Sequence, residues 1–303
     1  MLMRETVKLC VGVLICVGLL GYSFADDCPG NPAALGTSRV LKVNPVDYPL
    51  VGKLQYAETL RLHDREVVLT FDDGPVPLHT DKILEALAAE CVRATFFALG
   101  VNVAEAPDLL RRAFDAGHTI GTHTFSHPDL RKLSIEQAEK EIKLGITVAT
   151  TALGDTGRVS PFFRVPYLWT TKEVERLVVS RGLMLWSIDA DSEDWTFITP
   201  EKVVQQTIER LEKAGKGILL MHDIQARTAQ ALPLLLAELK QRGFRIVHVM
   251  PALNPETTAT AALQRPASAQ HLKDTILCAP TKRCAHRSRR CSGVFRGRIS
   301  NFP

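Results

Sequence analysis

The sequence predicts an α/β fold organised around a parallel sheet. Between residues 65 and 251, short apolar segments typical of buried strands alternate seven times with amphipathic helical segments, and this alternation indicates βα units with parallel strands. The polar clusters of this region come directly after the apolar segments, at the strand ends where parallel α/β folds build their sites. The pattern favours a closed barrel, and an open doubly wound sheet is the alternative.

Each strand and helix has its own local signal. Strands are expected where apolar runs end at Gly, Pro or polar residues, namely at 67–71, 94–99, 118–122, 162–163, 183–188, 217–221 and 245–249. The helices between them are recognised by caps and stops. They are 81–90 after Thr80, 107–116 before Gly117, one opened by a Ser134–Gln137 capping box, one capped by Thr170 with Glu173, one from Thr199-Pro200 to Ala214, and 228–242 before Gly243.

The N-terminus has the pattern of a secretory signal peptide. Arg4 and Lys8 precede an apolar run, and small residues at the cleavage positions end with Ala25. We expect residues 1–25 to be removed and the protein to be exported to the periplasm, the cell surface or the medium. The alternative is an uncleaved membrane anchor, although the apolar run is shorter than the roughly 20 residues that a spanning helix needs.

Two further segments flank the alternating region. Residues 26–64 contain scattered prolines and are expected to be irregular and to wrap the outside of the 65–251 domain. Residues 252–303 lose the periodic pattern and carry much of the excess positive charge, so we expect a disordered basic tail. A solvated charge run is favoured over contact with acidic polymers or membrane surfaces. We expect no nucleic-acid partner and no stable membrane insertion after cleavage.

The cysteines leave the disulfide pattern open. Of the seven, Cys10 and Cys16 leave with the signal segment. Export permits disulfides, but the remaining five cannot all pair within one chain. Cys91 lies in an apolar setting where a buried, unpaired cysteine is common, and the others are Cys28, Cys278, Cys284 and Cys291.

The first strand ends in two adjacent carboxylates. Asp72 and Asp73 are followed at once by Gly74 and Pro75, which turn the chain. Neighbouring side chains at a strand end point in different directions, so the two carboxylates can do different jobs. One can bind a cation while the other reaches towards a substrate. An ordinary Asp-Gly-Pro turn is the competing interpretation.

Two histidines follow the third strand. His123 and His127 are four residues apart, and two imidazoles with one carboxylate make a zinc site that leaves a coordination position for water. Asp73 is the candidate third ligand, because its strand end lies at the same edge of the sheet. The histidine pair alone would be a weak signal.

Further polar residues follow the later strands. Arg164 comes after the fourth strand, and its fork of donors can hold a carboxylate ionised. His222 comes after the sixth strand and is a candidate proton donor to a leaving group. Between them, the stretch from Trp186 to Trp195 contains several acidic residues.

These five motifs, in this order, resemble the polysaccharide deacetylase family, which includes the nodulation chitooligosaccharide deacetylases. They are the carboxylate pair, the two histidines, Arg164 to Tyr167, the acidic stretch, and Leu220 to His222. The resemblance covers residues 66–249 and implies a distorted (β/α)7 barrel and a metal-dependent N- or O-deacetylase.

The resemblance also implies a role for each matching residue. Asp73, His123 and His127 match the metal ligands, most simply of Zn²⁺, with Co²⁺ or another divalent cation as alternatives. Asp72 matches the general base. The remaining matches are Arg164, which orients that base, Tyr167, whose backbone N–H helps form the oxyanion hole, Leu220, which lines the acetyl pocket, and His222, the general acid.

The acidic stretch departs from the family pattern. The family has an aspartate near Trp186 that partners the acidic histidine, close before an Asp-Trp pair, but the loop here is longer. Counting from Trp186 selects Asp189, and counting back from Asp194-Trp195 selects Asp191. Asp189 is preferred because it lies directly at the strand end. The groove beside it, including Trp195, is the least secure part of the match.

The expected reaction is hydrolysis of an acetyl group on an N-acetylglucosamine-containing polysaccharide or oligosaccharide, such as chitooligosaccharide or peptidoglycan. Two other hypotheses share the motifs. One is a carbohydrate-binding protein that has lost catalysis, and the other is a xylan O-acetyl esterase or a small-amide hydrolase. The retained base, ligands and acid argue against the first of these.

Overall fold

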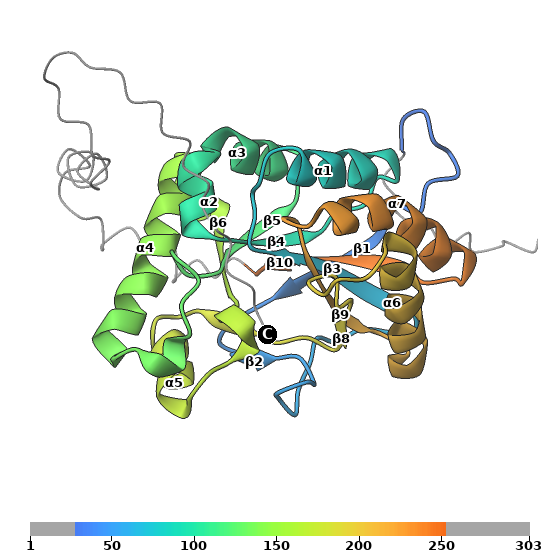
Figure 1. The fold of residues 1–303 in the computed structure, drawn as a ribbon. Helices are drawn as coiled ribbons and strands as arrows, with labels where there is room; N and C mark the ends of the chain where they lie inside the picture. The colour runs from blue at the N-terminus through green and yellow to red at the C-terminus, as the bar shows by residue number, and fades with distance from the viewer. Residues whose placement is uncertain (1–27, 253–303) are drawn as a thin grey trace, which may run out of the picture. The chain divides into compact units, whose positions relative to one another are not determined.

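The computed structural model describes residues 28–252, and within them ten strands form one sheet in which every pairing is parallel (Figure 1). The expected signal segment, the tail beyond Ala252 and five of the cysteines lie outside the described residues. The strands are β1 (Thr37–Val43), β2 (Leu50–Val51), β3 (Glu66–Asp72), β4 (Thr95–Ala98), β5 (Thr119–Thr122), β6 (Val159–Phe163), β7 (Met184–Trp186), β8 (Ala190–Asp191), β9 (Gly217–His222) and β10 (Arg245–Pro251).

The sheet closes on itself through β3, and this confirms the predicted distorted barrel. From β3, hydrogen-bonded neighbours run through β4, β5 and β6 to β7. The chain then leaves the ladder for residues 187–189 and resumes as β8, which pairs with β9, and β9 pairs with the other side of β3. The short break between β7 and β8 is the distortion. Strands β10 and β1 extend the sheet from the start of β3.

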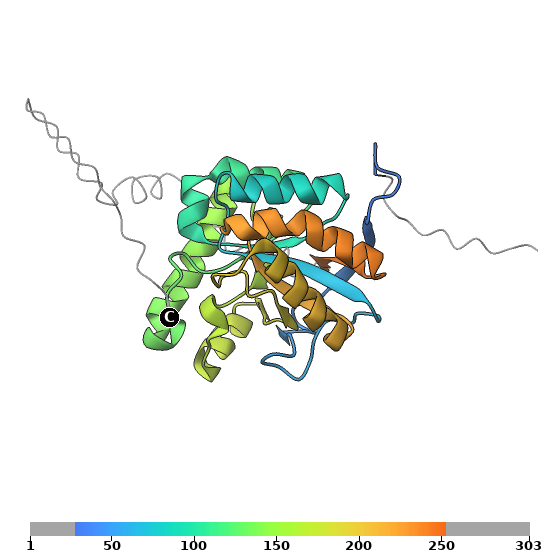
Figure 2. The same ribbon diagram turned by 45° about the vertical axis from the view of Figure 1, so that its right-hand side comes forward.

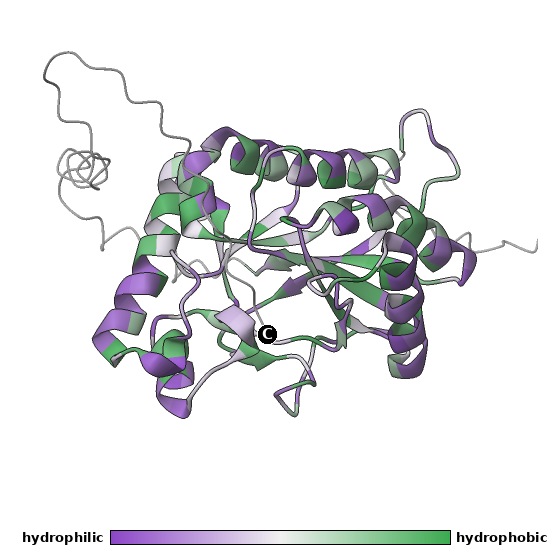
Figure 3. Cartoon of the chain, in the orientation of Figure 1, coloured by the Kyte–Doolittle hydropathy of each residue, from purple (hydrophilic) through white to green (hydrophobic). Residues whose placement is uncertain are grey.

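Alternating side chains divide the core into an inner and an outer part. Val68, Phe97, Phe162, Trp186 and Val247 belong to one buried cluster made of strand and N-terminal residues, which is the barrel interior. Their strand neighbours pack instead against helices in a second, larger cluster. Figure 3 shows this pattern as green strands and as helices that carry green on some positions and purple on others.

Seven α-helices of the described region lie around the sheet, and α1, α7 and α6 are neighbours along one side of it (Figure 2). Their starts follow local sequence: a Ser134–Gln137 capping box opens α4, and the Thr199 hydroxyl caps α6. The helices are α1 (His79–Ala89), α2 (Gly100–Glu105), α3 (Pro107–Asp115), α4 (Ile135–Leu153), α5 (Lys172–Ser180), α6 (Pro200–Ala214) and α7 (Ala226–Gln241). None of them combines the length and apolar character needed to cross a membrane.

All seven predicted strands are present, but several local predictions were wrong. Residues 26–64 were expected to be irregular, yet β1 pairs with β10 and β2 with β7. Helix α2 was not predicted, because its six residues are too few to show periodicity. Thr80 lies inside α1, where its hydroxyl donates to Asp223, and Thr171 rather than Thr170 caps α5.

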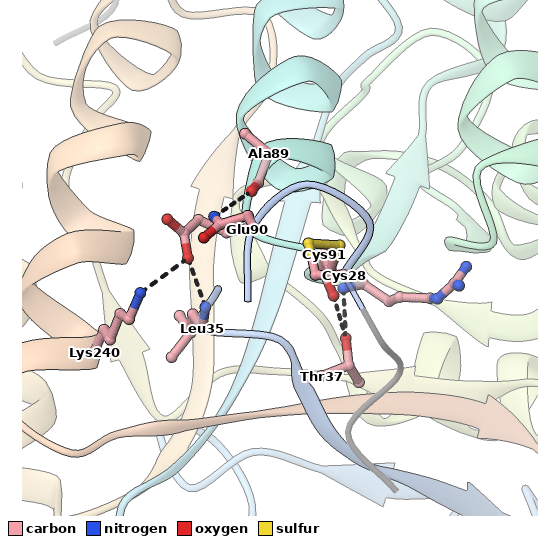
Figure 4. Close-up of a disulfide and its surroundings, with 9 residues drawn as sticks. Cys28, Leu35, Thr37, Ala89, Glu90, Cys91 and Lys240 are labelled. Carbon is pink, nitrogen blue, oxygen red and sulfur yellow. Dashed lines mark hydrogen bonds and ion pairs between the residues drawn. A yellow bond between two sulfur atoms is a disulfide. The ribbon is translucent and has the colours of Figure 1, made fainter. Parts of the chain in front are cut away.

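A disulfide fastens the N-terminal segment to the end of α1. Cys28 and Cys91 form this bond across 63 residues, with Cα atoms 5.6 Å apart (Figure 4). The interpretation of Cys91 as an unpaired buried cysteine was therefore wrong. Nearby, the Leu35 N–H and the Lys240 ammonium both contact the Glu90 carboxylate. On the chain-entropy account, a loop of this length stabilises the folded state by about 4 kcal/mol.

Two buried histidines lie at the opposite end of the barrel from the strand ends that carry the motifs. The Nδ1 of His118 accepts the Ala94 N–H at 3.1 Å, and the Nε2 of His248 lies 2.8 Å from the Thr119 hydroxyl. Burial lowers the pKa of His118 to about 3 and that of His248 to about 4, and nearby positive charge acts in the same direction. Their stabilising contribution is complete above the unfolded pKa of about 6.5 and is lost as the pH falls towards the folded values.

We expect His118→Asn to make the free energy of unfolding less dependent on pH. The amide oxygen can still accept the Ala94 N–H, but one titrating group is gone. Between about pH 6 and about pH 4 the slope should fall by up to about 1.4 kcal/mol per pH unit, the value for one proton. Denaturant unfolding over this range measures it. The exposed His63 provides the control, His63→Asn, which should leave the slope as in the wild type; an unchanged slope in His118→Asn contradicts the prediction.

Candidate metal centre and active site

The predicted residues converge at the carboxyl ends of neighbouring strands. Asp72 ends β3, and its partner in the β3–β9 ladder is His222. His123 follows β5 and Arg164 follows β6, which pair with each other. Parallel pairing therefore brings residues from four distant stretches of sequence to one edge of the barrel.

Three of the residues predicted from the sequence, Asp73, His123 and His127, form a candidate cation site. The Oδ1 of Asp73 lies 3.4 Å from the Nε2 of His123 and 3.3 Å from the Nε2 of His127, and the three possible ligand atoms lie within 4.8 Å of one another. Asp73 Oδ1 is buried and has no hydrogen-bond partner among the described residues. A buried carboxylate oxygen that lacks a partner and faces two imidazole nitrogens fits a divalent cation.

The protonation of His123 suits a metal ligand. Its Nδ1 lies 2.8 Å from the Arg164 carbonyl oxygen, so Nδ1 carries the proton and Nε2 presents a lone pair towards Asp73. Burial lowers the pKa of His123 to about 3, against the opposing effect of the Asp73 carboxylate. The ring is therefore neutral, as coordination requires.

Residues that sequence reasoning missed hold the two ligand loops. The Asp223 carboxylate accepts the Gly74 N–H at 2.8 Å, and a Cβ on Gly74 would lie 1.9 Å from that carboxylate. The Asn102 amide donates to the Asp73 carbonyl at 2.7 Å. Glu141 accepts the Ser126 N–H at 2.9 Å, between the two histidines. Only Asp223, next to His222, stood near a sequence signal.

Asp72 is held mainly by Arg164, and its other oxygen, Oδ2, lies 4.0 Å from the Nε2 of His123. The guanidinium donates to Asp72 Oδ1 at 2.7 Å and to the Thr70 hydroxyl at 2.9 Å, and both members of the ion pair are buried. Burial raises the pKa of Asp72, while the positive charge of Arg164 acts in the opposite direction. Two adjacent carboxylates thus have separate surroundings, as predicted.

The partner of His222 is Asp194, and the predictions of Asp189 and Asp191 were wrong. The Nδ1 of His222 lies 2.6 Å from Asp194 Oδ1, and the His222 N–H donates to Asp194 Oδ2 at 2.7 Å. Burial lowers the pKa of His222, but the Asp194 carboxylate outweighs it and raises the pKa to about 10. The break between β7 and β8 shifts the register of this stretch, so counting from Trp186 ends too early.

The two other aspartates have different partners. Asp189 points into the N-terminal segment, where it accepts the Lys53 N–H at 2.8 Å. Asp191 lies near the site, accepts the Glu193 N–H at 2.8 Å and is hydrogen-bonded to the side chain of the half-exposed Trp195. Leu220 is buried in β9, opposite Thr70 of β3. The substrate roles predicted for Trp195 and Leu220 stay predictions.

Tyr167 lies in a strained turn against the candidate metal ligands. Its ring contacts the His127 ring edge to face at 4.5 Å between centroids, and its hydroxyl donates to the His127 carbonyl at 3.4 Å. Tyr167 and Leu168 have φ values of 60° and 58°. Such left-handed backbone at residues other than glycine costs on the order of 1–3 kcal/mol each and persists only where neighbouring contacts hold it.

Comparisons with known proteins agree on one family. The family model described as polysaccharide deacetylase matches residues 60–186. The chain is 32% identical over 186 residues to the peptidoglycan-N-acetylglucosamine deacetylase PgdA of Listeria monocytogenes, covering 61% of this chain and 38% of PgdA. It is 31% identical over 205 residues to a chitooligosaccharide deacetylase of Bradyrhizobium, and this match covers 63% of this chain and 91% of the relative. The structure of a peptidoglycan deacetylase from Bdellovibrio bacteriovorus matches with a TM-score of 0.64 at 32% identity. This match covers 71% of this chain and 59% of the Bdellovibrio chain.

Fold and site together define a parallel α/β barrel with a candidate divalent-metal centre at the ends of its strands. The chain belongs to the polysaccharide deacetylase family, a metal-dependent family, as the sequence motifs predicted. It spans well under half the length of PgdA but nearly all of the Bradyrhizobium relative.

We expect the protein to bind one divalent cation per chain and His127→Ala to weaken that binding. Losing one of three ligands should cost about 100-fold or more in affinity, beyond the 10–100-fold typical of outer-shell changes. Calorimetric titration of the chelator-treated protein with Zn²⁺ measures this, and His63→Ala is a control at an exposed histidine. Undiminished zinc affinity in His127→Ala would place the cation elsewhere.

Proposed function

We propose that the protein is a metal-dependent deacetylase that removes acetyl groups from N-acetylglucosamine-containing glycans. The observation that carries this proposal is the separation of the two adjacent carboxylates. Asp73 faces His123 and His127 with a partnerless oxygen, whereas Asp72 is held by Arg164. At the end of β9, His222 is held by Asp194. A cation site, a base and an acid are the three parts that metal-assisted hydrolysis of an amide uses.

Each side chain would then have one task. A bound cation, best matched to Zn²⁺ by the donor set, supplies polarisation of the acetyl carbonyl and a lowered pKa of water. Asp72, oriented by Arg164, takes the proton from the attacking water. The Tyr167 backbone N–H donates to the developing oxyanion. His222 protonates the departing amine from Nε2, because its Nδ1 faces Asp194.

The substrate is proposed at the level of an acetylated amino-sugar polymer or oligomer. PgdA of Listeria is a peptidoglycan-N-acetylglucosamine deacetylase, and the Bradyrhizobium relative acts on chitooligosaccharides. Both relatives are named for substrates built from N-acetylglucosamine. This similarity favours N-deacetylation over hydrolysis of xylan acetyl esters. The presence of the base, the acid and the candidate ligands in one geometry argues against an inactive binding protein.

Export is part of the proposal. The Cys28–Cys91 disulfide fits an oxidising compartment, since structural disulfides are rare in the reducing cytosol. It joins the segment next to the expected cleavage point to the catalytic barrel. Acetylated wall or chitin glycans are also found outside the cytoplasm, which agrees with an exported enzyme.

Metal-loaded protein should release acetate from N-acetylglucosamine oligomers, and Asp72→Asn should lose on the order of 100-fold or more in kcat, because it removes the base. The variant should keep its zinc, since Asp72 is not among the three candidate ligands. Acetate assays with wild type, chelated wild type and the variant test this. Acetylated xylan, run in parallel, distinguishes the esterase alternative.

Two results would count against this assignment. Near-normal turnover by Asp72→Asn would remove Asp72 as the base. Zinc binding without acetate release from peptidoglycan, chitin oligomers or xylan would favour a glycan-binding protein that kept its metal.

Asp194→Asn should lose on the order of 100-fold in kcat, because His222 would no longer be held as a proton donor. Asp191→Asn, at the nearby aspartate that does not contact His222, should lose less than about tenfold on the same scale. Acetate release at saturating substrate compares the two variants, and melting curves exclude unfolding. The reverse order of effects would restore Asp191 as the partner.

A further inference from the structure

The loop of residues 52–59, which we call the anchor loop, lies before the region that the family model matches. It follows β2 and precedes residue 60, where the family match begins. Sequence reasoning placed it on the outside of the domain. In the structure it contacts both residues 187–189, between β7 and β8, and the turn that carries Tyr167.

One side of the anchor loop is fixed to the barrel through Asp189. This carboxylate accepts the Lys53 N–H, the Thr59 hydroxyl and the Ile218 N–H, each at 2.8 Å. The Leu54 N–H donates to the Ile188 carbonyl at 2.9 Å. Asp189 thus joins the loop to the first residues of β9. The residue that was predicted to partner His222 anchors this loop instead.

Gly52 lets the loop lie directly on the barrel backbone. Its φ is 105°, which favours glycine, and a Cβ there would lie 2.5 Å from the Ile188 nitrogen. The approach is therefore too close for any side chain. The first residue of the loop is therefore fixed against the backbone of residues 187 and 188.

The other side of the anchor loop reaches the Tyr167 turn. The Gln55 side-chain amide donates to the Leu168 carbonyl oxygen. The Tyr56 hydroxyl donates to Glu175 at 3.4 Å, on the helix α5 that follows the turn. The loop therefore spans from the β7–β9 side of the barrel to the turn after β6.

We propose that the anchor loop is part of the active site and that Gln55 is a positioning residue for the Tyr167 turn. This inference rests on the proposed deacetylase function. Within the turn, the Leu168 N–H donates to Val165 at 3.2 Å and the Trp169 N–H to Pro166 at 3.0 Å. These two bonds lie inside the turn, whereas Gln55, like the contacts of Tyr167 with His127, ties it to another segment.

The strain of the turn explains why an outside tie matters. Tyr167 and Leu168 both have left-handed backbone, which side-chain-bearing residues rarely adopt. Gln55 holds the peptide unit that follows Leu168, and this restrains the rotation of the two left-handed residues before it. The Tyr167 N–H must point at the oxyanion, and a displacement of about 1 Å in a catalytic group can cost on the order of 100-fold in rate.

Gln55→Glu tests the inference, because it keeps the shape of the side chain and removes the donor. We expect kcat to fall about tenfold, less than the 100-fold or more of deleting an oxyanion donor. KM, zinc content and melting temperature should stay as in the wild type. Gln55→Arg, whose Nε lies the same number of bonds from Cα, should keep the rate within about threefold of wild type by retaining a donor. Gln205→Glu, at an exposed position of α6, controls for the added charge.

Hydrogen exchange of residues 166–169, followed by mass spectrometry, gives a readout independent of activity. It should be faster in Gln55→Glu than in wild type and Gln205→Glu, because the turn loses one of its contacts with neighbouring segments. Unchanged exchange, an unchanged kcat, or a kcat loss matched by a lower melting temperature would each overturn the inference. If the wild type releases no acetate, the proposed function fails, and the exchange result alone decides whether Gln55 holds the turn.

Discussion

The buried ion pair between Arg164 and Asp72 is the interaction on which the site depends. Both side chains are removed from water, and the guanidinium also lies 4.3 Å above the Phe97 ring of the barrel interior. Removing one partner of such a pair leaves an uncompensated buried charge, at a cost of about 3–5 kcal/mol. Arg164 holds one oxygen of Asp72, whereas Asp73 lies closer to both histidines, with its Oδ1 3.4 Å from His123 and 3.3 Å from His127. The pair thus gives two adjacent, chemically identical residues different surroundings, one in an ion pair with Arg164 and one in the candidate metal centre.

Parallel strand pairing brings the other residues of the site together. The β3–β9 ladder sets Asp72 opposite His222, and the β5–β6 pair sets His123 beside Arg164, whose carbonyl fixes the tautomer of that histidine. Arg164 therefore takes part in both halves of the site, through its carbonyl oxygen to His123 and through its guanidinium to Asp72. The left-handed residues Asp73 and His127 then aim their side chains inward from the loops.

The sequence was most informative where chemistry and periodicity coincided. Polar residues followed five of the seven predicted strands, so the strands, the edge of the barrel and the candidate ligands Asp73, His123 and His127 could all be predicted. Asp194 could not, because the chain leaves the ladder between β7 and β8 and no periodic pattern marks that break. Nor could β2, whose two residues carry no alternation. The missed features are those set by tertiary contacts rather than by local pattern.

Tertiary contacts of the N-terminal segment show that the barrel begins before residue 65, the boundary predicted from the sequence. A domain that began at residue 65 would lack β1, which pairs with β10, and β2, which extends the sheet from β7. It would also lack the partners of Asp189, leaving a carboxylate beside the start of β9 with a single N–H donor, Ile218. Sheet pairing, the Cys28–Cys91 bond and the Gln55 contact all tie the same stretch to the barrel. The segment is therefore a structural part of the barrel, and the edge that carries the site is built from residues on both sides of that predicted boundary.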